Sequence, residues 1–125
     1  MILDTNALSA YADGAPQAGA ALRGIEGVAI PVIVLGEYRY GVAHSTRRRE
    51  YQAWLERYLP NFRILEVTAE TATAYAAIRS ELRQLGEPIP SNDIWIAALC
   101  RQHRLPLLSR DRHFDRIQGL RRLVW

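Results

Sequence analysis

The sequence contains no lysine and only one cysteine, and none of its apolar runs is long. A single cysteine, Cys100, cannot form an intramolecular disulfide, and it excludes a zinc site built from several thiolates. A membrane-spanning helix needs roughly 20 apolar residues, so we expect no membrane partner. The first residues, Met1 to Asp4, show no basic segment followed by an apolar one. We therefore expect no secretory leader and a cytoplasmic location.

The basic residues are all arginine, and the chain carries a small positive charge. Its 16 arginines and 13 acids give a formal net charge of +3. This balance permits a nucleic-acid partner without requiring one, since arginine can bind a phosphate through two hydrogen bonds at once. The hydrophobic share of 49% is enough to build a core, and 125 residues fit one domain, residues 1–125.

Short apolar runs alternate along the chain with segments of helical periodicity. The predicted strands are Ile2–Leu3, Val28–Ile30, Ile64–Val67, Leu105–Leu108 and a final edge strand at Leu123–Trp125. Helices are predicted over Val32–Ala43, from Thr46 to Pro60, from the cap Thr68 to Gly86, from Ser91 or Asn92 through Cys100, and as a short turn over His113–Ile117. This alternation predicts an α/β sandwich with a mostly parallel sheet.

Acidic residues follow the predicted strands or begin the predicted helices. Asp4 ends the first strand, Asp111 follows the fourth by three residues, and Asp93 lies in the first turn of a helix. Glu37 lies within a strongly apolar helix. Since ligands of parallel sheets bind beyond the carboxyl ends of the strands, we expect these acids to converge there. Converging carboxylates repel one another without a cation, and the lack of histidine among them favours Mg²⁺ or Mn²⁺ over zinc.

Each acid also has an explanation that needs no metal. Asp4 can cap the helix that follows it, Asp93 lies where a helix dipole favours any acid, and Asp111 can begin a turn. Glu37 can lie on a solvent face beside Arg39. The four acids together, at strand ends of one sheet, favour the metal site over these separate explanations.

The order of these motifs resembles that of PIN domains and, within them, of VapC-like toxins. The matching segments are Ile2–Asn6, Ile33–Gly41, Pro90–Ala98, Leu107–Phe114 and Gly119–Trp125. The resemblance implies a PIN-like three-layer α/β/α sandwich in which Asp4, Glu37, Asp93 and Asp111 hold Mg²⁺ or Mn²⁺ and cleave RNA. It also implies a VapB-like antitoxin as partner. A homodimer is expected as well, through the apolar and aromatic helices Thr46–Leu59 and Thr68–Leu85.

Other polar residues near these motifs are candidates for supporting roles. Asn6 and Ser109 can orient the metal ligands, and Asp115, one helical turn after Asp111, is a weaker candidate. The arginines that flank the fourth motif can contact RNA phosphates: Arg110, Arg112 and Arg116. The run Arg47–Arg49 has two explanations, an RNA contact and a solvated face, and we favour the solvated face.

The histidines and two departures from the family pattern lead to further expectations. The three histidines, His44, His103 and His113, show no ligand spacing, and we expect them to be surface or structural. The sequence departs from the family pattern at Ser109, where threonine is more usual, and at Tyr38, where leucine is commoner. We expect the first change to keep the hydrogen bonding and the second to concern packing.

Two other functions fit the same fold. One is a housekeeping RNA-processing nuclease, but the chain is short and has no extra nucleic-acid module. The other is a non-catalytic protein that binds an antitoxin and regulates transcription. Such a regulator would be expected to have lost some of the acids, and all four are present. The toxin ribonuclease is therefore the preferred interpretation.

Overall fold

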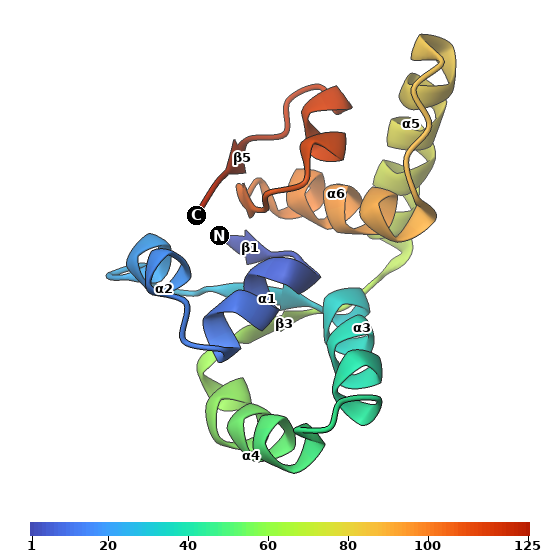
Figure 1. Ribbon diagram of the computed structural model, residues 1–125. Coiled ribbons are helices and arrows are strands. Elements are labelled where there is room, and N and C mark those ends of the chain that lie inside the picture. The colour runs from blue at the N-terminus through green and yellow to red at the C-terminus, as the bar shows by residue number, and fades with distance from the viewer.

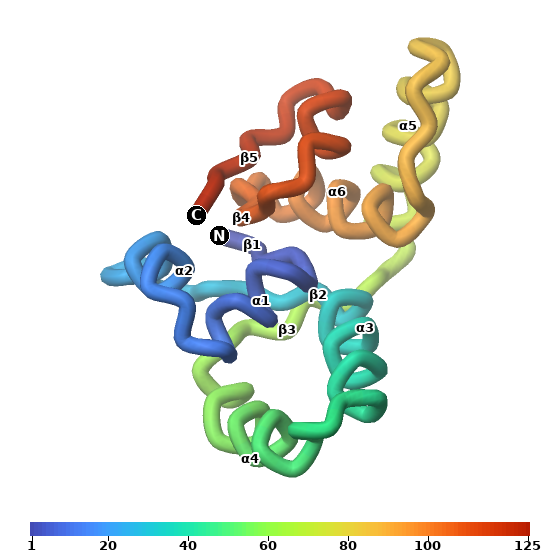
Figure 2. Tube along the Cα trace, viewed as in Figure 1, coloured from blue at the N-terminus to red at the C-terminus, as the bar shows by residue number.

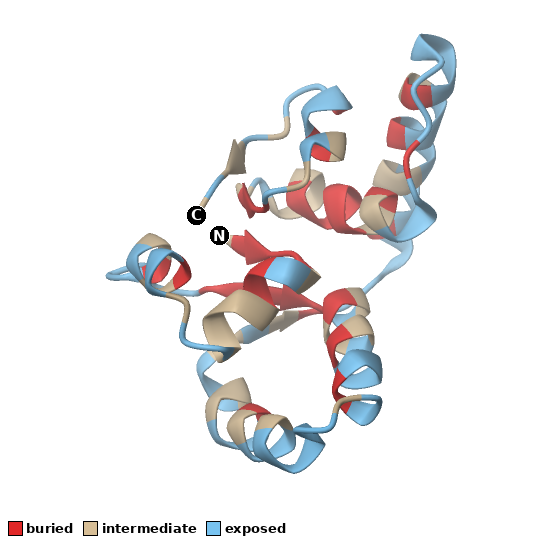
Figure 3. Cartoon of the chain, in the orientation of Figure 1, coloured by how far each residue is buried: buried red, intermediate tan, exposed pale blue.

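The computed structural model describes residues 1–125 and has a central sheet of five strands in the order β3-β2-β1-β4-β5. Every neighbouring pair is parallel. The strands are short: β1 (Ile2–Leu3), β2 (Ala29–Pro31), β3 (Arg63–Leu65), β4 (Leu107–Leu108) and β5 (Arg122–Leu123). The three central strands are fully buried and the two edge strands only partly (Figure 3). This is the burial expected of a parallel sheet covered on both faces.

Helices connect the strands and cover the sheet on two sides. They are α1 (Thr5–Ala12), α2 (Pro16–Leu22), α3 (Val32–Ala43), α4 (Arg48–Tyr58), α5 (Ala69–Leu85) and α6 (Ser91–His103), with 3-10 turns η1 (Leu59–Asn61) and η2 (Arg112–Arg116). Crossovers between parallel strands are right-handed almost without exception, which puts α1 to α4, on the way from β1 out to β3, on one face and α5 and α6, on the return to β4, on the other. In Figure 1, α1 and α4 lie on the β3 side of the molecule, and α5 and α6 lie on the side of β4 and β5. The expected three-layer α/β/α sandwich is confirmed.

The helix α5 begins and ends where its sequence predicts. Its N-cap is Thr68, whose backbone N–H donates to the Thr71 hydroxyl at 2.9 Å. Its C-cap is Gly86, which adopts the left-handed conformation (φ 67°) that other residues avoid. The predicted side-chain cap of α6 is wrong, because Pro90 precedes its first turn and Ser91 is already helical. The Ser91 hydroxyl instead hydrogen-bonds with that of Tyr75, at 3.0 Å.

Other element boundaries shift by a few residues from those predicted. The helix α4 begins at Arg48 rather than Thr46, and Pro60 falls within the turn η1 that follows it. Strands β3, β4 and β5 are each shorter than expected, and β4 starts late because the Leu105 N–H closes α6 by donating to the Cys100 carbonyl. The short helix α2 is not predicted at all, since only Ala18 and Leu22 of it are buried and two residues make no periodic pattern.

The large side chains of α4 and α5 pack mostly within the chain. On α4, Trp54 lies against Tyr11 with ring centroids 6.0 Å apart. On α5, Leu85 is the one large apolar side chain that is exposed, at 63%. These helices therefore offer less apolar surface to a second copy than their sequences suggest, and the homodimer stays a prediction. None of the helices combines the length and apolar character that crossing a membrane requires.

The direction of the chain through the sheet changes between β1 and β4. From β1 the chain moves outward through β2 to β3, and it then returns to place β4 on the other side of β1 (Figure 2). In open α/β sheets, ligands bind outside the carboxyl ends of the strands at such a switch point. Asp4 directly follows β1, and Ser109 directly follows β4.

Candidate metal centre

Asp4 is held rigidly at the carboxyl end of β1. Its backbone N–H donates to the Leu108 carbonyl of β4 at 3.3 Å. Its Oδ1 accepts a hydrogen bond from the Ala7 N–H at 2.8 Å, so it does cap α1. Only 6% of the residue is exposed. The cap occupies one carboxylate oxygen and aims the group over the sheet edge, so the capping role and a ligand role are compatible.

Glu37 faces α1 from the second turn of α3. Its Oε1 accepts a hydrogen bond from the Thr5 hydroxyl at 2.8 Å. The residue is half-buried, so the alternative of a solvent face beside Arg39 does not hold. Thr5 is a supporting residue that the sequence analysis missed. The available signal was its position directly after Asp4, at the start of α1.

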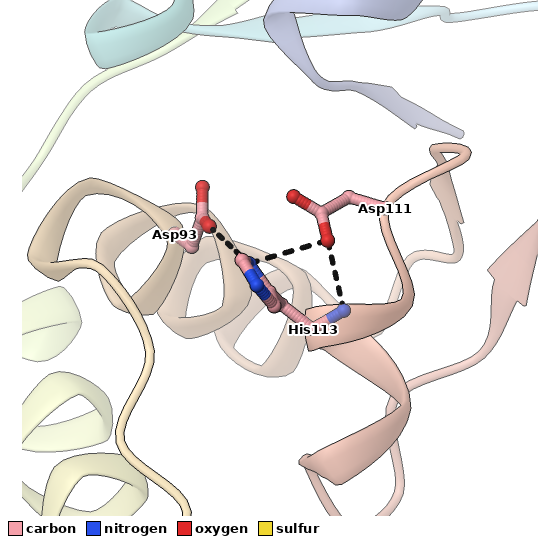
Figure 4. A group of neighbouring side chains, drawn as sticks. All are labelled: Asp93, Asp111 and His113. Carbon is pink, nitrogen blue, oxygen red and sulfur yellow. Dashed lines mark hydrogen bonds and ion pairs between the residues drawn. The ribbon is translucent and has the colours of Figure 1, made fainter.

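Asp93 and Asp111 lie on either side of His113 (Figure 4). The imidazole Nδ1 lies 3.5 Å from Asp93 Oδ2 and 3.2 Å from Asp111 Oδ1. One ligand atom from each residue lies within 4.8 Å of the others. Asp111 also begins η2 by accepting a hydrogen bond from the His113 N–H at 2.9 Å, so its turn-forming role is real as well.

The position of His113 corrects one expectation, namely that no histidine lies among the acids. The side chain instead stands between two of the four acids, with 41% of it exposed. Sequence spacing could not reveal this, because Asp93 is 20 residues away and only the packing of η2 on α6 brings the pair together.

Burial and neighbouring negative charges raise the pKa values of two of the acids, Asp4 and Asp93. Burial raises the pKa of Asp4, and the charges of Asp111 and Glu37 raise it further, although hydrogen bonds from Ser109 and Ala7 oppose this. Burial likewise raises the pKa of Asp93, with Asp111 and Glu37 adding to the rise and His113 opposing it. Burial is the larger cause in both cases, and the charges of Asp111 and Glu37 act on both Asp4 and Asp93.

The three expected supporting residues differ in whether they bond to a member of this cluster. Ser109 is fully buried, and its hydroxyl accepts a hydrogen bond from the Asp111 N–H at 3.0 Å. Asn6 is exposed and takes no part in these bonds. Asp115 points to Arg122, with both carboxylate oxygens 2.8 Å from guanidinium nitrogens. This ion pair lowers the pKa of Asp115 and leaves Ser109 as the closest support of the three.

Two of the three arginines expected to contact RNA are partly engaged by the chain itself. Arg110 donates to the Trp125 carbonyl at 2.9 Å and stacks over the Trp125 ring. Arg116 donates to the Pro88 carbonyl at 3.2 Å. Arg112 is exposed directly beside Asp111, which makes it the arginine best placed to meet a phosphate. In the run Arg47–Arg49, Arg47 pairs with Glu50 at 2.6 Å on the surface, in agreement with a solvated face.

The donor set fits a hard divalent cation. Carboxylate oxygens dominate it, two of them belong to acids whose pKa is raised by burial, and a positive ion would relieve the repulsion between them. Mg²⁺ and Mn²⁺ favour oxygen ligands, whereas an imidazole is more typical of zinc, copper, iron or nickel, so the carboxylates and not His113 favour Mg²⁺ or Mn²⁺. The exposed edge of the cluster, at Asp111 and His113, leaves room for a ligand to approach from solvent.

Comparison with known proteins identifies the family. Residues 1–120 match the PIN domain family. The chain is 33% identical over 94 residues to Ribonuclease VapC2 of Rickettsia felis, covering 74% of this chain and 70% of that protein. It is 31% identical over 97 residues to the tRNA(fMet)-specific endonuclease VapC of Shigella flexneri, covering 77% and 74%.

Solved structures give the same result for the fold. The VapBC2 complex of Rickettsia felis, crystallised with a DNA fragment from its promoter, contains a chain with a TM-score of 0.87 and 29% identity, covering 99% of this chain and 97% of that one. FitAcB from Neisseria gonorrhoeae gives a TM-score of 0.82 at 30% identity, covering 98% and 95%. The expected resemblance is confirmed, and the chain belongs to the PIN domain family, among its VapC-type ribonuclease toxins.

Proposed function

We propose that this chain cleaves RNA with a Mg²⁺ or Mn²⁺ ion held by Asp4, Glu37, Asp93 and Asp111, as the toxin of a toxin–antitoxin pair. The observation that carries the proposal is the meeting of Asp93, Asp111 and His113, with one ligand atom of each within 4.8 Å of the others. The charge of Glu37 acts on Asp93 and on Asp4. When bound, such an ion lowers the pKa of a coordinated water and offsets negative charge on a phosphodiester.

The residues of the chain prepare this site before any ligand arrives. Asp4 and Asp111 are each anchored by a backbone N–H, from Ala7 and His113, so their carboxylates cannot swing apart freely. Glu37 is held by the Thr5 hydroxyl. Preorganised ligands cost less to order on binding, and they favour one cation position over several. We assign phosphate binding to Arg112, which is exposed directly beside Asp111.

The same pocket accounts for an antitoxin partner. Similar chains have been solved in a toxin–antitoxin complex from Klebsiella pneumoniae and in a member of the VapBC family of toxin–antitoxin systems from Mycobacterium tuberculosis, and we extend that assembly to this protein. A cluster of carboxylates attracts a cationic side chain as well as a metal ion, and arginine can bind a carboxylate through two hydrogen bonds. An arginine of the antitoxin would therefore compete with the cation. Of the two alternative functions, the non-catalytic regulator is disfavoured because no acid of the cluster is missing.

The test is cleavage of RNA by the purified protein with Mg²⁺ or Mn²⁺ and with a chelator. We expect cleavage with either ion and none in chelator. Asp93→Asn should lower the rate more than about 100-fold, beyond the 10- to 100-fold loss typical of residues that only support ligands. The matched control is Glu66→Gln, an exposed acid that follows the edge strand β3 outside the cluster. Undiminished cleavage in chelator, or equal loss in the two variants, would contradict the proposal.

A further inference from the structure

A cavity of about 360 Å³ lies at the end of the sheet opposite the metal centre. Its wall includes Pro106, which directly precedes β4, and Arg121, which directly precedes β5. The C-terminal part of α6 forms another side of it, and Figure 2 shows the end of α6 beside β4 and β5. Asp4 and Asp111 instead follow the carboxyl ends of β1 and β4. The cavity is therefore separate from the proposed active site.

The wall of this cavity is positively charged. Three of its 11 lining residues are arginines, Arg101, Arg104 and Arg121, and none is acidic. Arg101 is already engaged, since it donates to the two carboxylate oxygens of Glu81 at 3.1 and 3.0 Å. Arg104 and Arg121 are exposed, and neither takes part in an ion pair of the chain. Two guanidinium groups therefore line the cavity without an anionic partner.

The pairing of β4 with β5 brings these two free arginines to the same place. The Leu107 N–H donates to the Arg121 carbonyl at 2.9 Å, which sets Arg121 beside the start of β4. Arg104 comes three residues before Leu107, in a turn that the Leu105 N–H closes by donating to the Cys100 carbonyl at 3.1 Å. Like charges repel, and an anion bound between the two guanidinium groups would relieve that repulsion.

Arg104 also has a backbone conformation that most residues avoid. Its φ of 55° makes it the one residue other than glycine in the left-handed region, at the C-cap of α6. Glycine is the usual residue at this point of a helix because it has no Cβ to clash, and Gly86 ends α5 in that way. Backbone strain of this kind tends to persist where the side chain has a role. The helix end gives no reason for an arginine here, and the unpaired charge beside the cavity does.

We propose that this cavity binds a phosphate group of the RNA, remote from the cleaved bond, between Arg104 and Arg121. Guanidinium groups bind phosphate oxygens through paired hydrogen bonds. The volume lies near the lower end of the roughly 300–1,000 Å³ of small-ligand sites, which leaves room for a phosphate with its sugar. This inference rests on the proposed ribonuclease function.

The distance between the two sites suits a polymer that contacts both. A helix rises about 1.5 Å per residue, so Arg104 lies about 16 Å along α6 from Asp93. The segment from Asp111 to Arg121 also joins the metal centre to the cavity, and its acid Asp115 is neutralised by an ion pair. Arg112 is exposed on this segment. An RNA strand that follows it would meet positive charge from the metal centre to the cavity.

The test measures RNA binding in chelator, where cleavage does not interfere. A fluorescently labelled RNA hairpin is titrated with protein at several salt concentrations and followed by anisotropy. Arg104→Gly and Arg121→Gln should each weaken binding about 10-fold, and each should reduce the slope of log affinity against log salt by about 1. Because glycine suits the left-handed conformation, Arg104→Gly should leave the melting temperature unchanged or raise it, so its weaker binding cannot come from unfolding.

The matched control is Arg63→Gln, which removes an exposed arginine from β3 at the other edge of the sheet. It should change neither the affinity nor the salt slope. Equal affinity and slope in wild type, Arg104→Gly and Arg121→Gln would overturn the assignment. A loss of antitoxin affinity in these variants with unchanged RNA binding would overturn it too, since the cavity would then hold an acidic segment of the partner.

A second probe, inorganic phosphate, distinguishes the source of the phosphate group. It is titrated in chelator and followed by NMR of the backbone amides of residues 104–106 and 118–121, where wild type should show shifts that both variants lose. Loss of these shifts with unchanged RNA binding would mean a site for free phosphate and would overturn the RNA assignment. If RNA binding depends on both arginines but no RNA is cut with Mg²⁺ or Mn²⁺, the proposed function fails and the cavity assignment stands.

Discussion

Asp93 behaves as a member of a charged group rather than as an isolated helix residue. It lies in the first turn of α6, where the helix dipole alone would favour its ionised form. Burial and the neighbouring charges of Asp111 and Glu37 nevertheless raise its pKa, against the effect of His113. Burial is the largest cause of the rise and the charges of Asp111 and Glu37 add to it, so a bound cation would relieve both the burial cost and the repulsion.

Asp93→Asn is expected to leave the metal-free fold intact. Removing one charge from a repelling cluster costs no favourable pairing except that with His113, and we expect a melting temperature unchanged or raised by up to about 4 °C in chelator. Differential scanning calorimetry of the two metal-free proteins measures this. A clearly lowered midpoint would mean that Asp93 stabilises the fold and that its effect on cleavage is indirect.

The contribution of Asp4 and Asp93 to the stability of the metal-free protein should fall as pH rises through the acidic range. The pKa values of Asp4 and Asp93 are raised above the ordinary 3.8 in the folded state, so the folded protein binds these protons more tightly than the unfolded chain. The resulting stabilisation is fully present below the unfolded pKa and is lost as pH rises through the folded values.

Urea denaturation in chelator between pH 4 and pH 7 provides the measurement, with Asp93→Asn as the comparison. Because the amide does not ionise, the variant should lose less stability over this range than the wild type. Other carboxyl groups titrate equally in both proteins, so the difference isolates Asp93. Parallel stability curves would count against a raised pKa at this position.

Helix α5 depends on one buried hydroxyl at its first turn. Thr71 is fully buried, accepts a hydrogen bond from the Thr68 N–H at 2.9 Å and donates to the Gln102 side chain of α6. One side chain thus both begins α5 and joins it to α6, the helix that carries Asp93. The support of the metal centre therefore extends to a helix that contributes no ligand.

Thr71→Val is expected to lower the free energy of unfolding by about 1–3 kcal/mol, because the Thr68 N–H and Gln102 lose their partner while the packing volume is kept. Thr73→Val is the matched control, since Thr73 is exposed and its hydroxyl makes only a long bond of 3.4 Å to the Ala69 carbonyl. Chemical denaturation of both variants tests this. Equal losses would show that β-branched substitution in α5, and not the hydroxyl, sets the cost.

The oligomeric state is a property of the whole molecule. We expect a homodimer, with α5 as part of the contact because Leu85 exposes 63% of its surface at the end of that helix. Light scattering at micromolar concentration should give twice the chain mass of 14.2 kDa. A monomer at that concentration would refute the dimer, and it would leave the metal centre unaffected because its residues all come from one chain.

Short local patterns in the sequence predict most of the strands and helices and all four acidic candidates. Strands β1 and β4 are short buried runs, followed by Asp4 directly and by Asp111 three residues later, and the sequence reveals both because polarity changes within a few residues. The same holds for Thr68 and Gly86, whose backbone roles are set by their own chemistry. Helix α2 was missed because it buries too few residues to show a period.

Contacts between residues far apart in the sequence could be found only from the tertiary structure. The bond from Thr5 to Glu37 joins residues 32 positions apart, and His113 meets Asp93 across 20. That the buried hydroxyl of Tyr38 has no hydrogen-bond partner is also a tertiary fact, since a helical tyrosine in the sequence gives no sign of whether its oxygen finds a partner. The residue types and their order are enough to identify the family and the charges, because both are local. How those charges are held, and which side chains line the cavity at the other end of the sheet, follow only from packing, because they depend on residues that lie far apart in the chain.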